Sequence, residues 1–329
     1  MTPETLAALR VAGLDAGEVA RVVAAALDED FRYGPDVTSA ATVAGRTLTA
    51  DVVARQAGVL AGTPVALAVL DLAADGADVA GTVLAPDGAR VASGDAVLRV
   101  SGPATAVLGA ERTMLNFLTR LSGIATATRA WADAVAGTGA VVRDTRKTTP
   151  GLRAVEKYAV RCGGGENHRM GLGDAALIKD NHVAAAGGVA GAVAAVRSAA
   201  GGVPLEVECD SLPQVREALA AGARFLLLDN MGVAALREAV AAARAYDGVR
   251  LEASGGLRLA TAREVALTGV DYLAVGALTH SSPALDLGLD VVDPLPNRVG
   301  DQLLVVSRRG DERGLRRIPG RWRSGSALP

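Results

Sequence analysis

The sequence has few of the residues that mark several large classes of protein. Phe, Trp and Tyr make up only 3% of the 329 residues, and modules that stack on nucleic-acid bases need aromatic side chains. Lys and Arg number 34 against 36 Asp and Glu, for a net charge of −2, so no overall attraction to nucleic acid or to an anionic membrane is expected. We therefore predict neither as a partner.

Cysteine and long apolar runs are also scarce. Cys162 and Cys209 are the only cysteines and form no Cys-x-x-Cys pair, which is typical of a reducing compartment. The start of the sequence has no signal-peptide pattern, and no apolar run approaches membrane-spanning length. We expect a cytoplasmic protein.

Half of the residues are hydrophobic, and 329 residues suit two domains, or one barrel with an added domain. Apolar residues recur at helical spacing over 4–28. Short extended runs follow at 48–53, 79–84 and 97–100, with a helical pattern at 64–72. This pattern predicts a small N-terminal α+β domain.

A long helix is predicted to begin near Pro103 and to run past Arg120. Apolar side chains recur at i, i+3, i+4 and i+7 from Met114 to Leu121. Arg112, Asn116 and Arg120 fall together on the opposite side of this helix. The helix should therefore bury one face and present a polar one.

After Gly139 the sequence alternates between buried-strand candidates and Ala-rich helices. The strand candidates are 141–142, 175–178, 205–207, 225–228, 249–251 and 272–275, and the helices are 188–200, 211–221, 232–245 and 260–268. Repeated β-then-α units predict a parallel sheet, either a closed or partly closed barrel or a doubly wound open sheet. In both arrangements, the residues that follow the strands gather at one edge.

Five cationic or potentially cationic residues lie in one short span beside Gly, Thr, Asn and Pro. They are Arg146, Lys147, His168, Arg169 and Lys179. A solvated helix face or a nucleic-acid surface could also carry them, but their neighbours are loop formers rather than residues at helical spacing. We interpret the cluster as an anion pocket.

Glu208 and Asp229 follow two later strands and would repel an anionic substrate. A Mg²⁺ ion between them would remove that conflict, since it prefers oxygen ligands and bridges phosphates. Their alternative role is to pair with the lysines of the site. The three histidines lack the short spacings of a zinc site, so hydrogen bonding to a substrate suits them better.

Small residues follow the last two strands, at Ser254-Gly255-Gly256 and at Gly276-Ala277. Their backbone N–H groups could hold a phosphate. A glycine after a strand also serves as a simple turn, and no Rossmann or Walker loop is present in the sequence.

With these residues in view, the chain resembles the nicotinate-nucleotide pyrophosphorylases, also called quinolinate phosphoribosyltransferases. The likeness covers about residues 15–292. The matching segments are Glu111 to Thr113, Leu115 to Phe117, Leu121 to Thr126, Asp144 to Arg153, Lys157 to Ala159, Gly163 to Arg169, Leu177 to His182, Glu206 to Glu208, Leu228 to Asn230, Glu252 to Gly256 and Gly276 to Ser281.

The resemblance implies an α/β fold with an N-terminal α/β sandwich and an incomplete (β/α) barrel of the type II phosphoribosyltransferase kind, seven-stranded in the family. It implies the reaction of quinolinate with phosphoribosyl pyrophosphate to give nicotinate mononucleotide, pyrophosphate and carbon dioxide in NAD biosynthesis. The domains expected are a sandwich at 1–112, a catalytic barrel at 113–284 and a return segment at 285–296 that packs on the sandwich. An Arg-rich tail, expected to be disordered, follows at 297–329.

The resemblance also implies a role for each motif residue. Arg146, His168, Arg169 and Lys179 would hold the quinolinate carboxylates, helped by Arg112 of the neighbouring subunit in a homodimer or a higher oligomer. Lys147 would contact both substrates, with Thr145 beside it, and Glu208 and Asp229 would face the ribose hydroxyls and Mg²⁺. The 5-phosphate would bind at Ser254, Gly255, Gly256, Val275, Gly276 and Ala277.

Two other functions remain open for the sequence. A phosphoribosyltransferase of the same fold could act on another acid, as in the type associated with molybdenum transport. A non-catalytic protein could instead use the anion pocket to sense metabolites.

Overall fold

The computed structural model describes residues 1–292. The tail predicted at 297–329 and the last residues of the segment 285–296 lie outside the described residues. Two helices, α1 (Pro3–Val11) and α2 (Ala16–Phe31), confirm the helical pattern of 4–28. Each is capped by the residue before it, since Thr2 and Asp15 accept hydrogen bonds from backbone N–H groups of the first turn.

The short helix α3 (Val37–Thr42) was not predicted. It begins after the loop Gly34 to Asp36, where the Asp36 carboxylate accepts hydrogen bonds from the N–H groups of Thr38 and Ser39 at 3.0 Å. Asp36 is thus an N-cap residue, and its place after a Gly-Pro pair could have indicated a helix start.

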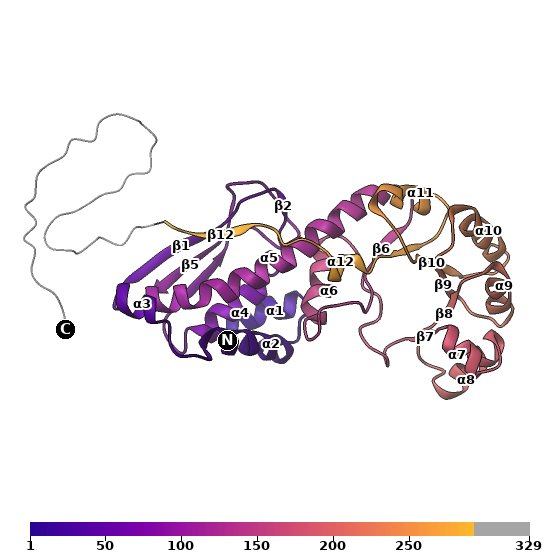
Figure 1. Ribbon diagram of the computed structural model, residues 1–329, viewed down its shortest axis with the longest axis horizontal. Helices are drawn as coiled ribbons and strands as arrows, with labels where there is room; N and C mark the ends of the chain where they lie inside the picture. Colours follow the sequence, from indigo (N-terminus) through magenta and orange to yellow (C-terminus); the bar gives the residue numbers. More distant parts are fainter. Residues whose placement is uncertain (293–329) are drawn as a thin grey trace, which may run out of the picture. The chain divides into compact units, whose positions relative to one another are not determined.

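The N-terminal part is built around a four-stranded antiparallel sheet in the order β12-β1-β5-β3. Its strands are β1 (Thr47–Ala54), β3 (Ala80–Val83), β5 (Ala96–Pro103) and β12 (Leu287–Val291), and β2 (Gly58–Val59) pairs separately with β4 (Arg90–Val91). The helix α4 (Thr63–Ala73) lies close to 64–72, as predicted. The strand β12, which was not predicted as a strand, returns from the C-terminal end of the described chain to lie beside β1 (Figure 1).

The long helix α5 (Ala104–Val135) begins at the predicted position and runs for 32 residues. Its apolar stripe is buried, with Met114 and Leu118 both 0% exposed. Arg112 and Asn116 are exposed, but Arg120 is not part of a free polar face, because its guanidinium pairs with Glu156 at 2.8 Å. The predicted domain boundary at 112/113 falls inside this helix. Within residues 1–292, no helix is both long enough and apolar enough to cross a bilayer.

Six parallel strands form the C-terminal sheet in the order β6-β11-β10-β9-β8-β7. Their bounds are Val141–Arg143 (β6), Ala176–Ile178 (β7), Leu205–Cys209 (β8), Phe225–Asp229 (β9), Arg250–Ser254 (β10) and Tyr272–Ala274 (β11). The order never reverses, and the first strand adjoins the last, which is the winding of a barrel and not of a doubly wound sheet. The described pairing leaves β6 and β7 unjoined, so the barrel is incomplete.

The resemblance implied seven barrel strands, whereas the described residues contribute six to this sheet. At the edge beside β6, an isolated parallel bridge joins Arg143 to Glu166. The segment around Glu166 thus occupies a seventh position without forming a named strand, because only one residue pair meets the pairing geometry.

Helices join the strands and lie along the outer side of the sheet (Figure 1). Their bounds are Arg153–Cys162 (α6), Asp180–Ala185 (α7), Val189–Ala199 (α8), Leu212–Ala220 (α9), Val233–Ala243 (α10), Ala262–Ala266 (α11, after the 3-10 turn Leu259–Thr261) and Ala277–His280 (α12). The helices α8, α9 and α10 fall within three of the predicted helix ranges. The helix α11 with its 3-10 turn lies close to the fourth predicted helix, 260–268. The helices α6, α7 and α12 were not predicted, because charged or motif residues occupy most of their length.

A fully buried ion pair fixes the end of β6. The Lys157 ammonium of α6 donates to the Asp144 carboxylate, and both side chains are 0% exposed. Lys157 also donates to the His168 carbonyl at 2.8 Å, while Asp144 accepts from the His168 N–H at 2.9 Å. Burial raises the pKa of Asp144 and lowers that of Lys157, but these hydrogen bonds favour the charged forms. The pair therefore ties β6, α6 and the segment at His168 together.

We expect Lys157→Met to lower the free energy of unfolding by about 3–5 kcal/mol, because it leaves the buried Asp144 carboxylate without its cation. Urea denaturation followed by circular dichroism measures the change. The matched control is Asp133→Asn, which breaks an exposed pair with Arg90 and should leave the midpoint close to that of the unmodified protein. A loss below about 1 kcal/mol for Lys157→Met would contradict this account.

Candidate active site

One cavity of about 570 Å³ opens where the barrel strands end. Strand register explains its lining, because side chains alternate between two faces along a strand. Glu208 pairs in register with Leu227, and Asp229 with Ser254, and all four of these side chains line the cavity. Predicted site residues in the lining are Thr145, Arg146, Lys147, His168, Arg169, Lys179, Glu208, Asp229, Ser254, Gly255 and Gly256.

Two guanidinium groups give the cavity unbalanced positive charge. Arg146 forms no ion pair within residues 1–292, and its buried Nε has no hydrogen-bond partner. The Arg169 guanidinium donates to the Ala175 carbonyl at 2.9 Å, and its pKa is lowered by burial and by the charge of Arg146. Repulsion between these neighbouring positive charges is relieved when an anion lies between them. This side of the cavity therefore favours an anion.

Two lysines and two carboxylates complete the charges in the cavity. The Lys179 ammonium pairs with Glu208 across β7 and β8, which matches the alternative role given to that carboxylate. The Lys147 side chain is exposed and makes no ion pair within residues 1–292. Four cationic side chains against Glu208 and Asp229 leave an excess of two positive charges in the lining.

The ends of β9 and β10 form a compact backbone turn at the cavity. Gly255 has φ +83°, and a Cβ there would lie 2.3 Å from the Asn230 side-chain oxygen and 2.8 Å from the Asn230 nitrogen. Asn230 itself has φ 55° and donates its N–H to the Ser254 carbonyl at 2.9 Å. Asn230 lines the cavity but was not predicted, because the Asp-Asn sequence alone does not distinguish a lining residue from a turn.

Four predicted residues are not in the lining of this cavity. Val275 and Gly276 follow β11, and Gly276 lies against Thr145 and Lys147, since a Cβ there would be 3.0 Å from the Lys147 Cδ. Ala277 begins α12. Arg112 is exposed on α5 and makes no ion pair within residues 1–292.

The other two histidines also lie outside this cavity. His182 accepts the Lys179 N–H on its Nδ1 at 3.0 Å and lines a separate apolar cavity beneath α7 and α8. His280 bonds to the Ser281 hydroxyl at 2.6 Å. The structure therefore gives no support to substrate contacts by these two.

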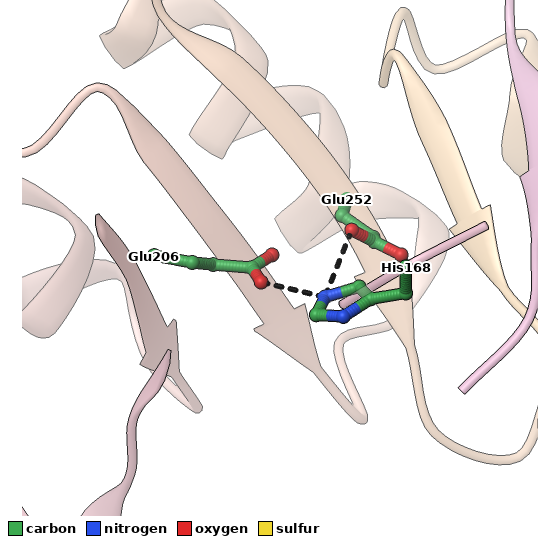
Figure 2. Close-up of side chains that lie close together, drawn as sticks. All are labelled: His168, Glu206 and Glu252. Atoms are coloured by element: carbon green, nitrogen blue, oxygen red, sulfur yellow. Dashed lines mark hydrogen bonds and ion pairs between the residues drawn. The ribbon is translucent and has the colours of Figure 1, made fainter. Parts of the chain in front are cut away.

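Four residues form a buried group, the interior charge cluster, which consists of Arg143, His168, Glu206 and Glu252. Only His168 was predicted as a site residue. Figure 2 shows the His168 ring between the two carboxylates, with Nε2 2.7 Å from Glu206 Oε2 and 3.7 Å from Glu252 Oε2. Glu206 precedes Glu208 by two residues on β8, so strand alternation could have placed it inside the barrel.

Arg143 balances part of this cluster. Its guanidinium donates to Glu252 at 2.8 Å and lies 4.6 Å from the ring centre of Tyr272. Burial raises the pKa of Glu206 to about 7 and that of Glu252 to about 8. Burial also lowers the pKa of His168. The carboxyls thus favour protonation, and the imidazole favours its neutral form.

Comparisons with known proteins agree with this architecture. Residues 36–122 match the family described as quinolinate phosphoribosyl transferase, N-terminal domain, and residues 124–290 match its C-terminal domain. The nicotinate-nucleotide pyrophosphorylase [carboxylating] of Mycobacterium leprae is 57% identical over 271 residues, covering 81% of this chain and 94% of the relative. The probable enzyme of that name from Bacillus subtilis is 41% identical over 264 residues, covering 80% and 90%.

The fold agrees as well. The structure of the nicotinate-nucleotide pyrophosphorylase from Francisella tularensis superposes with a TM-score of 0.80 at 37% identity, covering 84% of this chain and 97% of that one. The family description thus spans both the antiparallel sheet and the barrel whose mouth holds the cavity. The chain belongs to the quinolinate phosphoribosyltransferase family.

Proposed function

We propose that the cavity at the barrel mouth is the active site of a carboxylating nicotinate-nucleotide pyrophosphorylase. The reaction transfers ribose 5-phosphate from phosphoribosyl pyrophosphate to the ring nitrogen of quinolinate, and it yields nicotinate mononucleotide, pyrophosphate and carbon dioxide in de novo NAD biosynthesis. The excess of positive charge in the cavity, centred on Arg146 and Arg169, carries the proposal. Family membership and the names of the relatives support it.

The two substrates divide the cavity in this proposal. Arg146 and Arg169 face the two carboxylates of quinolinate, because planar guanidinium groups pair with carboxylates through two hydrogen bonds. Lys147 lies beside Gly276 and reaches both substrates. The backbone turn of Ser254 to Gly256 receives the 5-phosphate, since uncharged backbone N–H groups in such a turn can donate hydrogen bonds to an anion.

The chemistry needs charge stabilisation and alignment rather than a nucleophilic side chain. As pyrophosphate departs, the anomeric carbon gains positive charge, and the quinolinate nitrogen attacks it. The positive ring nitrogen then withdraws electrons from C2, so the C2 carboxylate leaves as carbon dioxide and C2 takes up a proton. Neither cysteine suits covalent catalysis, since burial raises the pKa of both Cys162 and Cys209 to about 12.

Glu208 and Asp229 fit a Mg²⁺ site. They project from the neighbouring strands β8 and β9 into the same cavity, and Mg²⁺ is held by one or two carboxylates together with substrate phosphates and waters. When bound there, Mg²⁺ would neutralise charge on the pyrophosphate group. The carboxylate oxygens would meanwhile face the positive charge that develops on the ribose.

The position of Arg112 favours a homodimer in which each subunit completes the other's cavity. Arg112 is exposed on α5, next to a groove of about 380 Å³ lined by residues such as Thr113, Asn116 and Phe117. It does not line the cavity of its own chain. We further propose that the enzyme works in the cytoplasm, in keeping with its two free thiols.

Turnover with defined substrates tests the reaction. We expect mass detection of nicotinate mononucleotide from quinolinate, phosphoribosyl pyrophosphate and Mg²⁺, and loss of product when the metal is chelated. Arg169→Ala should raise KM for quinolinate by about ten- to a hundred-fold, because it removes a charged hydrogen-bond donor. Arg237→Ala on the outer helix α10 is the control and should leave KM unchanged.

The rival functions predict different results in the same assay. Turnover of nicotinate but not of quinolinate would identify a different substrate. Binding of these acids without release of pyrophosphate would identify a sensor rather than an enzyme.

Mixing two inactive variants tests the exchange of Arg112 between subunits. Arg112→Ala and Lys147→Ala homodimers should each be nearly inactive. If mixed subunits reassort, half of the dimers are hybrids, and each hybrid contains one site with both residues intact, so activity should recover to about a quarter of the unmodified rate. No recovery, with hybrids verified by mass spectrometry, would place Arg112 outside the neighbour's site.

A further inference from the structure

The loop at 145–150 follows β6 and brings Arg146 and Lys147 to the cavity. Its internal hydrogen bonds are short-range, such as the bond from the Thr148 N–H to the Arg146 carbonyl at 3.0 Å. Bonds of this kind shape a turn but do not decide where the turn lies. The position of the two cations therefore depends on bonds from the loop to neighbouring elements.

Glu156 of α6 holds the end of this loop. Its side chain is 0% exposed, and it accepts the Thr149 N–H on Oε2 at 2.9 Å and the Thr149 hydroxyl on Oε1 at 2.7 Å. A buried carboxylate also needs a cation beside it. Arg120 of α5 supplies that cation, since its Nη2 donates to the same Oε1 at 2.8 Å. One carboxylate thus joins the loop to α5.

The Arg120 guanidinium also binds the end of α12. It donates to the Thr279 carbonyl and, at 3.2 Å, to the Ser282 carbonyl. The Thr279 side chain is 0% exposed, and its hydroxyl donates to the Lys147 carbonyl at 2.9 Å. The helix α12 begins at Ala277, in the segment that we propose for the 5-phosphate. Arg120 is therefore bonded to supports of both parts of the site.

Close packing gives Arg120 a fixed base on α5. Gly123 lies three residues further along the helix, and a Cβ there would be 2.1 Å from the Pro283 carbonyl oxygen. Only glycine allows the two backbones to approach this closely. The Leu285 N–H also donates to the Thr119 carbonyl at 2.9 Å. The backbone of α5 is thus joined directly to the segment that follows α12.

We propose that Arg120 is a positioning residue, which sets the spacing between the loop that carries Arg146 and Lys147 and the 5-phosphate segment at the start of α12. This inference deepens the proposed function and rests on it for its kinetic consequences. Arg120 does not line the cavity and acts through Glu156 and Thr279. An ion pair that served stability alone would leave the KM values unchanged, whereas a spacing residue affects both substrates.

Steady-state kinetics of Arg120→Lys tests this role. Lysine keeps a positive charge beside Glu156, but its single ammonium group lacks the planar fork that serves several separate acceptors. We expect kcat/KM to fall about ten- to a hundred-fold, with KM raised for both quinolinate and phosphoribosyl pyrophosphate, because a displacement of about 1 Å is enough for such a loss. Arg99→Lys is the matched control, since it alters the pair with Asp51 in the N-terminal sheet, and it should leave both KM values unchanged.

Substitutions of Thr279 test the same connection without removing a charge. Thr279→Val has nearly the same shape but loses the hydroxyl that binds the Lys147 carbonyl, and it should raise KM for phosphoribosyl pyrophosphate about two- to ten-fold. Thr279→Ser keeps the hydroxyl and should restore KM to nearly the value of the unmodified enzyme. The double variant Arg120→Lys/Thr279→Val should lose less than the product of the two separate effects, because both act on one loop.

Hydrogen exchange separates this inference from the proposed function, since it needs no turnover. In the substrate-free full-length chain, Arg120→Lys should speed amide exchange in peptides covering 145–152 and α12 by about ten-fold, and Arg99→Lys should not. If Arg120→Lys does not fold, the Thr279 variants decide the outcome by the same measurement.

Three results would overturn the inference. They are unchanged exchange in the loop of the folded Arg120→Lys variant, KM values of that variant equal to those of the unmodified enzyme, and equal losses for Thr279→Ser and Thr279→Val. Failure of the unmodified enzyme to turn over quinolinate would reject only the proposed function.

Discussion

The whole site depends on one constraint, which is the alternation of side chains along parallel strands that wind in a single direction. Alternate residues of a strand point to the same face, and neighbouring strands are in register, as for Glu208 with Leu227 and Asp229 with Ser254. Residues far apart in the sequence therefore enter one interior. On β8 and β10 the last inward residues, Glu208 and Ser254, line the cavity, and the preceding ones, Glu206 and Glu252, are buried beneath it.

This alternation divides the barrel interior into two charged layers with different roles. The upper layer meets solvent and carries an excess of positive charge. The lower layer contains the interior charge cluster, where Arg143 is surrounded by aromatic rings and buried carboxyls. Because charges in the lower layer are screened little by water, each must be balanced locally. His168 joins the two layers, since its ring bonds to Glu206 below and its backbone leads into Arg169 above.

The strength of the support around His168 has a physical reason. A guanidinium held beside another cation tends to move apart from it, so a pocket with two neighbouring arginines needs a rigid frame. The buried pair of Asp144 and Lys157 supplies one part of that frame and the interior hydrogen bonds supply another. Burying these charges lowers the stability of the fold, but it fixes the geometry of the cavity, which favours binding and catalysis.

Much of this arrangement could be predicted from the sequence. Periodicity and apolar runs predicted the long helix, all six barrel strands of the described residues and three of the outer helices. Motif residues after the strands predicted most of the cavity lining, including Arg146, Lys179 and Glu208. The short helix α3 was missed, because its signal is a single cap residue. The family resemblance implied a return segment at 285–296, but its strand β12 was not predicted, because the partner strand lies more than two hundred residues away. Local sequence cannot show a pairing of that kind.

The sequence by itself determined which residue types are available at the strand ends, because hydrophobic periodicity and the motifs are properties of the chain. Only the tertiary structure decided which charges pair and which remain free. Arg120 is neutralised by Glu156 and Lys179 by Glu208, while Arg146 forms no ion pair within residues 1–292. It also brought the ring of His168 against Glu206, since a contact of this kind exists only once distant segments are brought together.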